Sequence, residues 1–330
     1  MKKYLNFPNV LVMVLVLVFT ASCDLDDDTP PTIPIPDTNI VEIAQSNPDL
    51  STLVAALERA DLVSTLQGTT LYTVLAPTNT AFDNFLGEAG FASLDEVPVA
   101  TLQQLLLNHV ILERIESALL VSLQRNYLQT LADGPGTDTN LAMYFDATNG
   151  VQFNGGATVT TADVVASNGI IHIVDEVIGL PTLATFVSVD DTFRELDTAI
   201  DVVSPNTDLD EELDTATGPF TLFIPSNTAF EILLNSNPDW NSSSDIPEDL
   251  LLSVLAHHVV PGNIRSTSIS DGQTVTTLEG DEIEFLSVAG SLEITDGSGT
   301  AGTRIPVTDI QTSNGVIHVI DAVLIPNTEN

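Results

Sequence analysis

Basic residues are scarce in this chain of 330 residues. Lysine and arginine together number eight, against 46 aspartates and glutamates, so the formal net charge is −38 at pH 7. Nucleic-acid binding draws much of its affinity from Lys and Arg that neutralise phosphates, so this balance excludes nucleic acid as a partner. The apolar fraction of 43% is nevertheless too high for a disordered acidic chain. The length suits two folded domains rather than one small one.

Cysteine and aromatic residues are also rare. The single cysteine, Cys23, excludes an internal disulfide framework and a thiolate cluster for a structural metal. Aromatic residues make up 5% of the chain, and Trp240 is the only tryptophan. Both lysines, Lys2 and Lys3, lie at the very start, so the rest of the chain sets 46 acids against six arginines. Such a surface favours solubility in high salt, and we expect either a salt-rich habitat or divalent cations that bridge to a partner.

Residues 1–22 have the form of a secretory signal peptide. A basic start is followed by the apolar run Val10–Phe19 and by the small residues Ala21 and Ser22, directly before Cys23. The apolar run is short for a membrane span. The segment resembles the leader of a bacterial lipoprotein, which implies an acylated Cys23, secretion by the general pathway and a lipid anchor in the outer membrane. The alternative is a plain cleaved signal with an unused cysteine.

Residues 23–37 predict an extended linker between the anchor and the folded part. They contain the acidic run Asp24–Asp28 and the proline-rich stretch Thr29–Pro36. The acidic run resembles the export signal of some Gram-negative surface lipoproteins, which implies a position facing the cell exterior. A solvated linker without such a signal is the alternative.

The remaining chain is an internal repeat. Three pairs of segments recur in the same order at offsets of 146 to 149 residues. The pairs are Tyr72–Phe82 with Phe220–Phe230, Leu107–Ile111 with Ala256–Val260, and Asp163–Asp175 with Asp309–Asp321. Such a long period predicts two tandem globular domains, residues 38–181 and 182–326, followed by a tail of residues 327–330. Because so few residues separate the copies, we expect a short, fixed junction.

Within each copy, helical patterns come first and strand patterns follow. Helices are predicted at Leu50–Leu66, Ala81–Leu86 and Leu102–His109, with one early strand at Tyr72–Leu75. Later strands are predicted at Leu141–Phe145, Val151–Phe153, Ala157–Thr161 and Ile170–Val177, and in the second copy at Thr274–Leu278, Ile283–Leu286, Leu292–Thr295 and Val316–Leu324. This order predicts an α+β class with antiparallel strands around a sandwich-like sheet.

The repeated boxes resemble those of the fasciclin (FAS1) domain. The boxes are Pro-Thr/Ser-Asn-Thr-Ala-Phe and Ser-Asn-Gly-x-Ile-His-x-x-Asp. The residues that match them, mostly structural in role, are Pro77, Asn79, Phe82, His109, Asn168, Gly169, His172 and Asp175 in the first copy and Pro225, Asn227, Phe230, His258, Asn314, Gly315, His318 and Asp321 in the second. The resemblance implies a β-sandwich wedge with helices at one side. It also implies a surface-anchored adhesion or matrix-interaction protein that is not an enzyme and that binds an extracellular protein, matrix component or glycan. No cofactor and no metal site are predicted, because no motif for either is found.

Most of these residues are predicted to have structural roles. Asn79 lies two residues after a proline, where it can cap the helix that follows. Phe82 is expected in the core, and Gly169 is expected to supply a positive φ before the last strand. His172 and Asp175 are three apart on a strand, so they point to opposite faces and do not form half of a catalytic triad. Each of these expectations extends to the matching residue of the second copy.

A second histidine position recurs at His109 and His258. The family often has a Tyr-His pair there, implicated in adhesion in animal members, but here the preceding residues are Asn108 and His257. Recognition through that pair is therefore not expected. Adjacent helical residues diverge by about 100°, and no third ligand is evident, so His257 and His258 do not predict a metal site.

Two other readings compete with adhesion. A carbohydrate-binding surface lipoprotein for nutrient capture would need exposed aromatic platforms, which this composition barely provides. An enzyme is disfavoured because no catalytic motif is found. The stretch Gly297–Gly302 spells a dinucleotide fingerprint, but a strand pattern follows it instead of a helix, so a hairpin loop is predicted.

Overall fold

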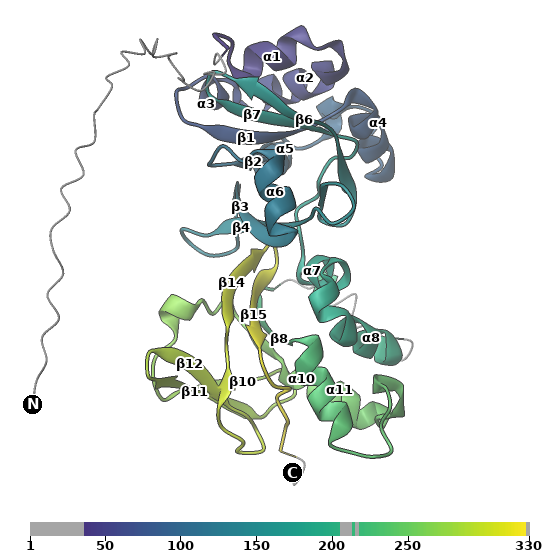
Figure 1. Cartoon of the computed structure of the whole chain (residues 1–330), viewed down its shortest axis with the longest axis vertical. Helices are drawn as coiled ribbons and strands as arrows, with labels where there is room; N and C mark the ends of the chain where they lie inside the picture. Colours follow the sequence, from purple (N-terminus) through teal and green to yellow (C-terminus); the bar gives the residue numbers. More distant parts are fainter. Residues whose placement is uncertain (1–35, 205–212, 215–217, 328–330) are drawn as a thin grey trace, which may run out of the picture. The chain divides into compact units, whose positions relative to one another are not determined.

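The computed structural model describes residues 36–204, 213–214 and 218–327, which belong to one compact unit (Figure 1). The proposed signal peptide, residues 1–22, and the proposed anchor Cys23 lie outside the described residues. So does all but the end of the linker, residues 23–37. Among the described helices, none has the length and hydropathy needed to cross a membrane.

The first domain begins with helices and continues into a closed barrel of strands. Its helices are α1 (Ile40–Ser46), α2 (Ser51–Arg59), α3 (Val63–Leu66), α4 (Asn79–Glu88), α5 (Val99–Asn108) and α6 (Ser117–Leu123). Its strands are β1 (Tyr72–Pro77), β2 (Val110–Ile111), β3 (Arg125–Asp133), β4 (Asn140–Asp146), β5 (Gln152–Phe153), β6 (Ala157–Ala166) and β7 (Gly169–Val174). The barrel order follows the chain from β1 to β7, and β7 closes onto β1.

The second domain repeats this order. Its longer helices are α7 (Leu183–Val189), α8 (Arg194–Val203), α10 (Asn227–Asn235) and α11 (Glu248–His257). Its strands are β8 (Phe220–Pro225), β9 (Val259–Pro261), β10 (Gln273–Thr276), β11 (Glu282–Val288), β12 (Ser291–Thr295), β13 (Thr303–Arg304), β14 (Val307–Thr312) and β15 (Gly315–Ile320). They form two sheets of four strands, in the orders β10-β11-β12-β13 and β14-β15-β8-β9. The predicted α+β class with two tandem domains is confirmed.

The later strands of each domain pair antiparallel as predicted, but the early strand, for which no partner was predicted, does not. The early strand β1 runs parallel to the last strand β7, from Tyr72 opposite Gly169 to Pro77 opposite Val174. In the second domain β8 and β15 pair in the same way. A parallel pair needs a long crossover, and here the crossover is nearly the whole domain. The pattern of apolar residues predicts where the strands are but not which strands pair with one another.

The single helix predicted for Leu50–Leu66 is divided in two. Helix α2 ends in a Schellman motif, in which Leu62 N–H donates to the Leu57 carbonyl and Asp61 N–H donates to the Glu58 carbonyl. Asp61 takes the left-handed conformation that this motif requires, with φ of 57°. The apolar spacing continues through the break because Leu62 and Leu66 are buried in the same core, so the sequence pattern hides the turn.

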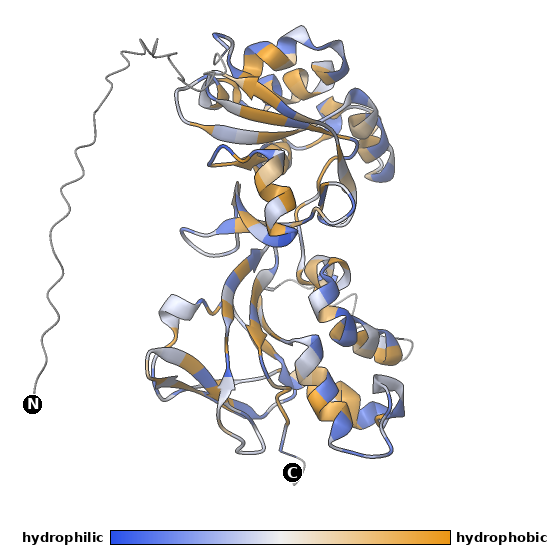
Figure 2. Ribbon diagram, in the orientation of Figure 1, coloured by the Kyte–Doolittle hydropathy of each residue, from blue (hydrophilic) through white to orange (hydrophobic). Residues whose placement is uncertain are grey.

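Each domain has an apolar cluster under its helices and another inside its strands. Figure 2 shows hydrophobic residues alternating with hydrophilic ones along the strands and lining the inner faces of the helices. Phe82 of α4 and Phe230 of α10 are fully buried in these clusters. The cluster under the second domain's helices also contains Ala142 and Tyr144 from β4 of the first.

The glycine-rich stretch Gly297–Gly302 joins β12 to its antiparallel partner β13, so the predicted hairpin loop is confirmed.

Candidate functional site

A buried histidine lies on the last strand of each domain. His172 of β7 accepts a hydrogen bond at Nδ1 from the Asp163 N–H (3.3 Å). Its Nε2 therefore carries the proton and donates to the Ile115 carbonyl (2.9 Å). His318 of β15 makes the same two contacts with its own domain, at 3.3 and 2.8 Å. Each ring joins the last strand to a segment just before a short helix, which is α6 in the first domain and the 3-10 helix Ser266–Ser268 in the second. Both nitrogens of each ring are therefore engaged, and neither ring is available as a base.

The aspartates three residues further on do not pair with these histidines. The Asp175 carboxylate accepts the Thr158 N–H at 2.7 Å. The Asp321 carboxylate accepts the Arg304 N–H at 2.8 Å. Each carboxylate thus binds the backbone of a neighbouring strand, on the face away from the imidazole. The arrangement is not half of a catalytic triad.

A Ser-Asp pair that no sequence motif predicted lies next to each strand histidine. Asp163 has φ of 59° and Asp309 has φ of 64°, a conformation that few non-glycine residues adopt. Their carboxylates accept the backbone N–H of Ser117 (2.9 Å) and of Ser266 (2.8 Å), and also a short hydrogen bond from each serine hydroxyl. The only sequence signal was that each aspartate opens the longest repeated string.

The predicted helix caps at Asn79 and Asn227 were assigned to the wrong helix. Helix α4 is capped by Thr78, whose hydroxyl accepts the Ala81 N–H. The Asn79 side chain instead accepts the Thr52 N–H (2.9 Å) in the first turn of α2, and it donates to the Pro48 carbonyl (2.9 Å). Helix α2 has no side-chain cap of its own, so a residue distant in sequence supplies one.

Asn227 repeats this arrangement in the second domain. Its side chain accepts the Glu195 N–H (3.0 Å) at the start of α8 and donates to the Asp191 carbonyl (2.8 Å). Ser226 caps α10 in its place. Both asparagines therefore fasten one helix of their domain to another.

The Ser-Asn-Gly box fastens the start of each domain to its last strand. Asn168 accepts the Ile40 N–H (2.9 Å) at the start of α1 and donates to the Leu66 carbonyl (2.7 Å). Asn314 likewise accepts the Leu183 N–H (2.9 Å) at the start of α7. The side chain of one asparagine thus connects segments about 100 residues apart.

Close packing requires the glycine of this box in both domains, whereas the predicted positive φ is confirmed at Gly169 and was wrong at Gly315. A Cβ on Gly169 would lie 2.0 Å from the Tyr72 carbonyl oxygen, and one on Gly315 would lie 2.2 Å from that of Phe220. The φ of Gly169 is 150°, but Gly315 is not among the glycines with positive φ. The parallel strands therefore approach too closely at this point for any side chain.

The second pair of histidines ends α5 and α11. His109 donates from Nδ1 to the Leu105 carbonyl (2.8 Å) and accepts the Ile178 N–H at Nε2 (2.9 Å). His258 does the same with the Val254 carbonyl (2.6 Å) and the Leu324 N–H (2.9 Å). Burial lowers the pKa of both to about 4. These neutral rings hold the segment that leaves the last strand of each domain.

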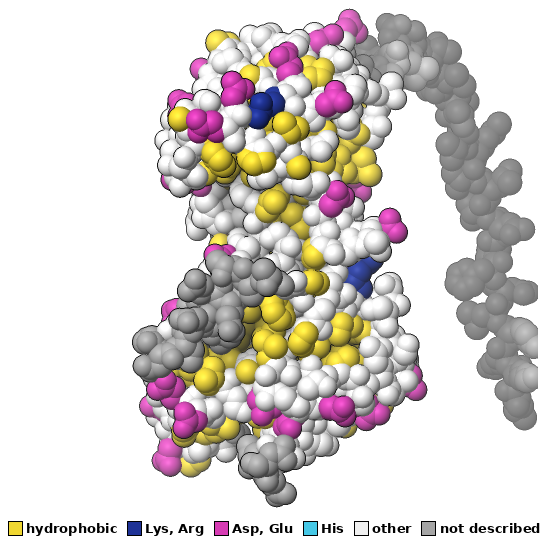
Figure 3. All heavy atoms as spheres, turned by 180° about the vertical axis from the view of Figure 1, so that it is seen from behind, with side chains coloured by type: hydrophobic (Ala, Val, Ile, Leu, Met, Phe, Trp, Pro, Cys, Tyr) yellow, Lys and Arg dark blue, Asp and Glu magenta, His cyan; other side chains and the backbone are white. Residues whose placement is uncertain are grey.

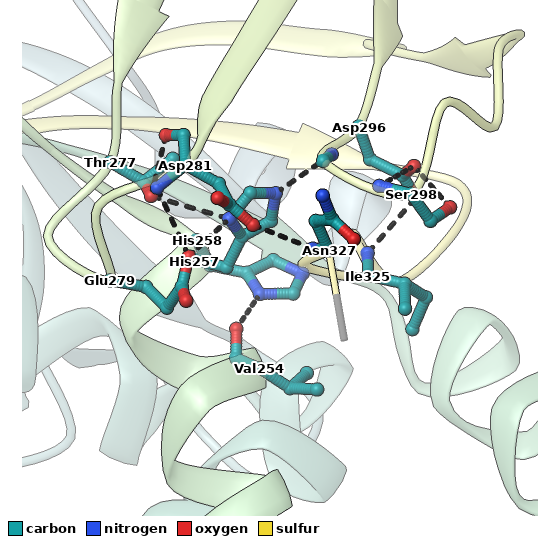
Figure 4. Close-up of polar contacts among 11 residues, drawn as sticks. Val254, His257, His258, Thr277, Glu279, Asp281, Asp296, Ser298, Ile325 and Asn327 are labelled. Atoms are coloured by element: carbon teal, nitrogen blue, oxygen red, sulfur yellow. Dashed lines mark hydrogen bonds and ion pairs between the residues drawn. The ribbon is translucent and has the colours of Figure 1, made fainter. Parts of the chain in front are cut away.

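The residue directly before this histidine differs between the domains. In the first, Asn108 is fully buried, its Nδ2 donates to the Gly179 carbonyl (3.0 Å), and its Oδ1 has no hydrogen-bond partner among the described residues. In the second, His257 is fully buried and reaches an acidic loop (Figure 4). Its Nδ1 lies 3.4 Å from a Glu279 oxygen and 3.2 Å from the Thr277 hydroxyl.

His257, Glu279 and Asp281 place three ligand atoms within 4.8 Å of one another, so the prediction that no third ligand lies near His257 was wrong. The hydrogen bonds nevertheless oppose a metal ion. Nε2 of His257 accepts the Gly297 N–H (3.1 Å), so Nδ1 carries the proton and donates toward the acids. A metal at Nδ1 would force a proton onto Nε2, facing the Gly297 N–H. Burial lowers the pKa of His257, an effect that Glu279 opposes.

Two acids near this ring, Asp296 and Asp281, bind the end of the described chain. Asp296 accepts the Ile325 N–H (2.9 Å), and Asp281 accepts the Asn327 N–H (2.6 Å). In Figure 4 the two adjacent imidazoles point in different directions, His258 toward the Val254 carbonyl and His257 toward the acidic loop. Together they fix the segment after β15 to α11.

The junction between the domains is a packed and hydrogen-bonded contact. Tyr127 of β3 donates to the Asp190 carboxylate (2.7 Å), and its ring meets the Phe186 ring edge-on at 5.2 Å. The Arg125 guanidinium lies 2.9 Å from the Asp191 carboxylate. These contacts join β3 of the first domain to the start of the second.

Trp240 does not form an open aromatic platform. It is half-buried, packs on the second domain's core, and lines an apolar groove with Leu233, Leu250 and Ile325. Sugar recognition usually requires polar partners beside the ring, and this groove offers few. The nutrient-capture reading therefore gains no support from this residue.

The family model of the fasciclin domain matches the chain twice, over residues 48–181 and 194–326. The chain therefore belongs to the fasciclin domain family. The pig transforming growth factor-beta-induced protein ig-h3 is 27% identical over 265 residues, which cover 80% of this chain and 36% of that protein. The chain thus spans about a third of that relative. The cell surface glycolipoprotein MPB83 of Mycobacterium bovis is 29% identical over 109 residues, 33% of this chain and 44% of that one.

A solved structure shows the same fold. The FAS1 domain pair from the insect cell adhesion molecule fasciclin I matches with a TM-score of 0.51 and 20% sequence identity. The match covers 84% of this chain and 97% of that structure. Two fasciclin domains in tandem are therefore the shared architecture.

Proposed function

We propose that this protein acts outside the cell as a non-catalytic adhesion and matrix-interaction protein. Its two fasciclin domains bind an extracellular protein, matrix component or glycan, and an acylated Cys23 holds the chain at the outer face of the outer membrane. Two linked binding modules also provide avidity when both can engage at once.

The observation that carries this proposal is that the chemically capable side chains of the family boxes are engaged inside the fold. His109, His172, His258 and His318 each use both ring nitrogens on backbone groups of their own domain. A general base must reach a substrate proton, and these rings do not. Within the described residues the motifs build a scaffold, which is what a binding protein needs.

The relatives support the location and the role. The matching solved structure comes from a protein described as a cell adhesion molecule, and MPB83 is described as a cell surface glycolipoprotein. The acidic surface suits an exposed position: Figure 3 shows many Asp and Glu side chains and few Lys and Arg on the face in view. Cations that bridge this surface to a partner would make attachment depend on divalent ions.

The anchor is tested by replacing its acceptor. In cells that produce the full chain, Cys23→Ser is expected to move the protein from the membrane fraction into the medium or periplasm. Ser22→Ala, which keeps the cysteine and a small residue before it, serves as the matched control and is expected to stay with the membrane. Equal membrane association of wild type and Cys23→Ser would refute the lipid anchor.

Adhesion is tested separately from the anchor. Cells that display the wild-type chain are expected to attach to a matrix-coated or cell-coated surface more than cells that lack it. Purified soluble Cys23→Ser protein is expected to compete with this attachment, and EDTA is expected to reduce it if divalent cations form the bridge. Attachment that is indifferent both to the displayed chain and to the soluble competitor would refute the proposed function.

A further inference from the structure

Four Asn-Gly dipeptides occur in this chain. They are Asn149-Gly150, Asn154-Gly155, Asn168-Gly169 and Asn314-Gly315. Asparagine is a chemically labile residue, and a following glycine exposes it most, because no Cβ hinders attack of the glycine nitrogen on the asparagine side chain. This cyclisation needs a side-chain amide that can leave and a backbone that can rotate. The structure therefore decides which of the four dipeptides can react.

Two of the asparagines are held by the amide nitrogen that would have to leave. Asn168 donates from Nδ2 to the Leu66 carbonyl (2.7 Å), and Asn314 donates to the Leu213 carbonyl (2.6 Å). The glycine after each begins a strand, β7 or β15, that is paired with a neighbour on both sides. Neither the side chain nor the backbone can turn here while the domain stays folded.

Asn154 is held by both its side chain and its backbone. Its Oδ1 accepts the Tyr144 N–H (2.9 Å), and its own N–H donates to the Tyr144 carbonyl (3.0 Å). The following residue is also tightly packed, since a Cβ on Gly155 would lie 2.6 Å from the Val189 side chain. Rotation that brings the Gly155 nitrogen onto the asparagine side chain would break these contacts.

Asn149 lacks these restraints. It is exposed in the turn between β4 and β5, and its side chain makes no hydrogen bond among the described residues. Gly150 is exposed as well, and open space lies where its Cβ would be. One isolated bridge, between Thr148 and Gly150, is the backbone pairing of this turn, in place of the continuous ladders at the strand glycines. The turn thus has the side-chain freedom and the space that cyclisation requires.

We propose that Asn149 is a site of spontaneous conversion to aspartate and isoaspartate. The Gly150 nitrogen loses its proton to hydroxide and bonds to Cγ of Asn149. The bond from Cγ to the side-chain nitrogen breaks, and that nitrogen takes up a proton and leaves as ammonia. Water then opens the succinimide ring at one carbonyl or the other, which gives aspartate or isoaspartate. Water is the only co-reactant, and the inference does not depend on what the protein binds.

Conversion adds a negative charge next to a contact between the domains. Asn149 and Asp146 line one surface hollow of about 150 Å³. The Asp146 carboxylate pairs with Arg125 (2.7 Å), which also lies 2.9 Å from the Asp191 carboxylate of the second domain. The modification therefore changes the charge of the turn that holds this arginine.

The test follows the purified soluble chain during warm storage at mildly alkaline pH. Phe145 and Phe153 flank Asn149, so chymotrypsin releases residues 146–153, which contain no other Asn-Gly dipeptide. Mass spectrometry is expected to show that this peptide gains about 1 Da, the difference between an amide and a carboxylic acid. In the native protein, conversion here is expected to be more than about tenfold faster than at the other three dipeptides, because those react only when the fold opens.

Two controls separate the effect of the fold from that of the sequence. Storage in guanidinium chloride unfolds the chain, and all four dipeptides are then expected to convert at similar rates. Asn149→Gln keeps an amide but moves it one methylene farther from the Gly150 nitrogen, so the mass of peptide 146–153 is expected to stay constant. An unconverted peptide 146–153 in the native protein, under conditions that convert the unfolded chain, overturns the proposal. Equal rates at all four dipeptides in the native protein also overturn it.

Discussion

Acidification is expected to weaken this fold through two buried histidines, His109 and His258. Each is neutral in the folded protein because burial lowers its pKa from about 6.5 to about 4. The unfolded chain takes up these protons near pH 6.5, so it is favoured as the pH falls below that value. The free energy of unfolding therefore carries no penalty from these histidines above pH 6.5. It falls as the pH drops from 6.5 to 4, and the loss levels off below pH 4.

The magnitude follows from the two pKa values. Between pH 7.5 and pH 4.5, one histidine with this shift removes about 2.5 kcal/mol from the free energy of unfolding. Two such groups remove about 5 kcal/mol, which is a large part of the stability of an ordinary domain. Protonation of carboxylates acts in the opposite direction, because it relieves the repulsion of a surface with net charge −38. A comparison with a histidine variant is therefore needed to isolate the effect.

The assay is urea unfolding at pH 7.5 and pH 4.5 for wild type and for His109→Gln. The loss of stability on acidification is expected to be about 2.5 kcal/mol smaller in the variant. If that variant does not fold, NMR titration of the imidazole C–H resonances of the wild-type protein gives the two pKa values directly. Titration of His109 and His258 near pH 6.5 would refute the reasoning.

Three further predictions follow from the same geometry. Gly169→Ala is expected to lower the free energy of unfolding by more than about 3 kcal/mol, because the added Cβ would overlap the Tyr72 carbonyl. Gly87→Ala, which adds a Cβ in open space, is the control and is expected not to cause this loss; urea unfolding measures both variants. Asn79→Ala is expected to cost about 1–2 kcal/mol in the same assay by uncapping α2, and no change would contradict the capping role. Added Zn²⁺ is expected to leave the melting temperature unchanged, because the proton on Nδ1 of His257 faces the acids; a rise that EDTA reverses would show a metal site.

Much of the fold could be predicted from the sequence because the chain contains two copies of the same domain sequence. The repeated strings gave two domains and the order of helices before strands, and Phe82 and Phe230 are buried as their places in the box suggested. The parallel pairing of β1 with β7 could not be predicted, because both strands read alike and nothing local records which strand lies beside which. The helix break at Asp61 was hidden because its flanking leucines share one core.

The site was predicted less completely because its contacts join distant segments. Asn79 was expected to serve its own helix, yet it caps one that begins 28 residues earlier, at Ser51. Glu279 and Asp281 reach His257 only after the chain has turned back through β9 and β10. The left-handed conformation of Asp163 leaves no compositional trace. Such features depend on tertiary packing. Repetition in the sequence shows that these residues matter, but it does not show which residues they contact.

Crosslinking on intact cells tests the central claim most directly. The full-length chain, crosslinked at the surface of living cells and purified under denaturing conditions, is expected to carry an extracellular protein, matrix component or glycan. A chain that lacks Cys23 and is released from the cell serves as the control. Recovery of the anchored chain without any such component, at a crosslinking yield that joins other surface proteins to their known neighbours, would contradict the account of an adhesion and matrix-interaction protein.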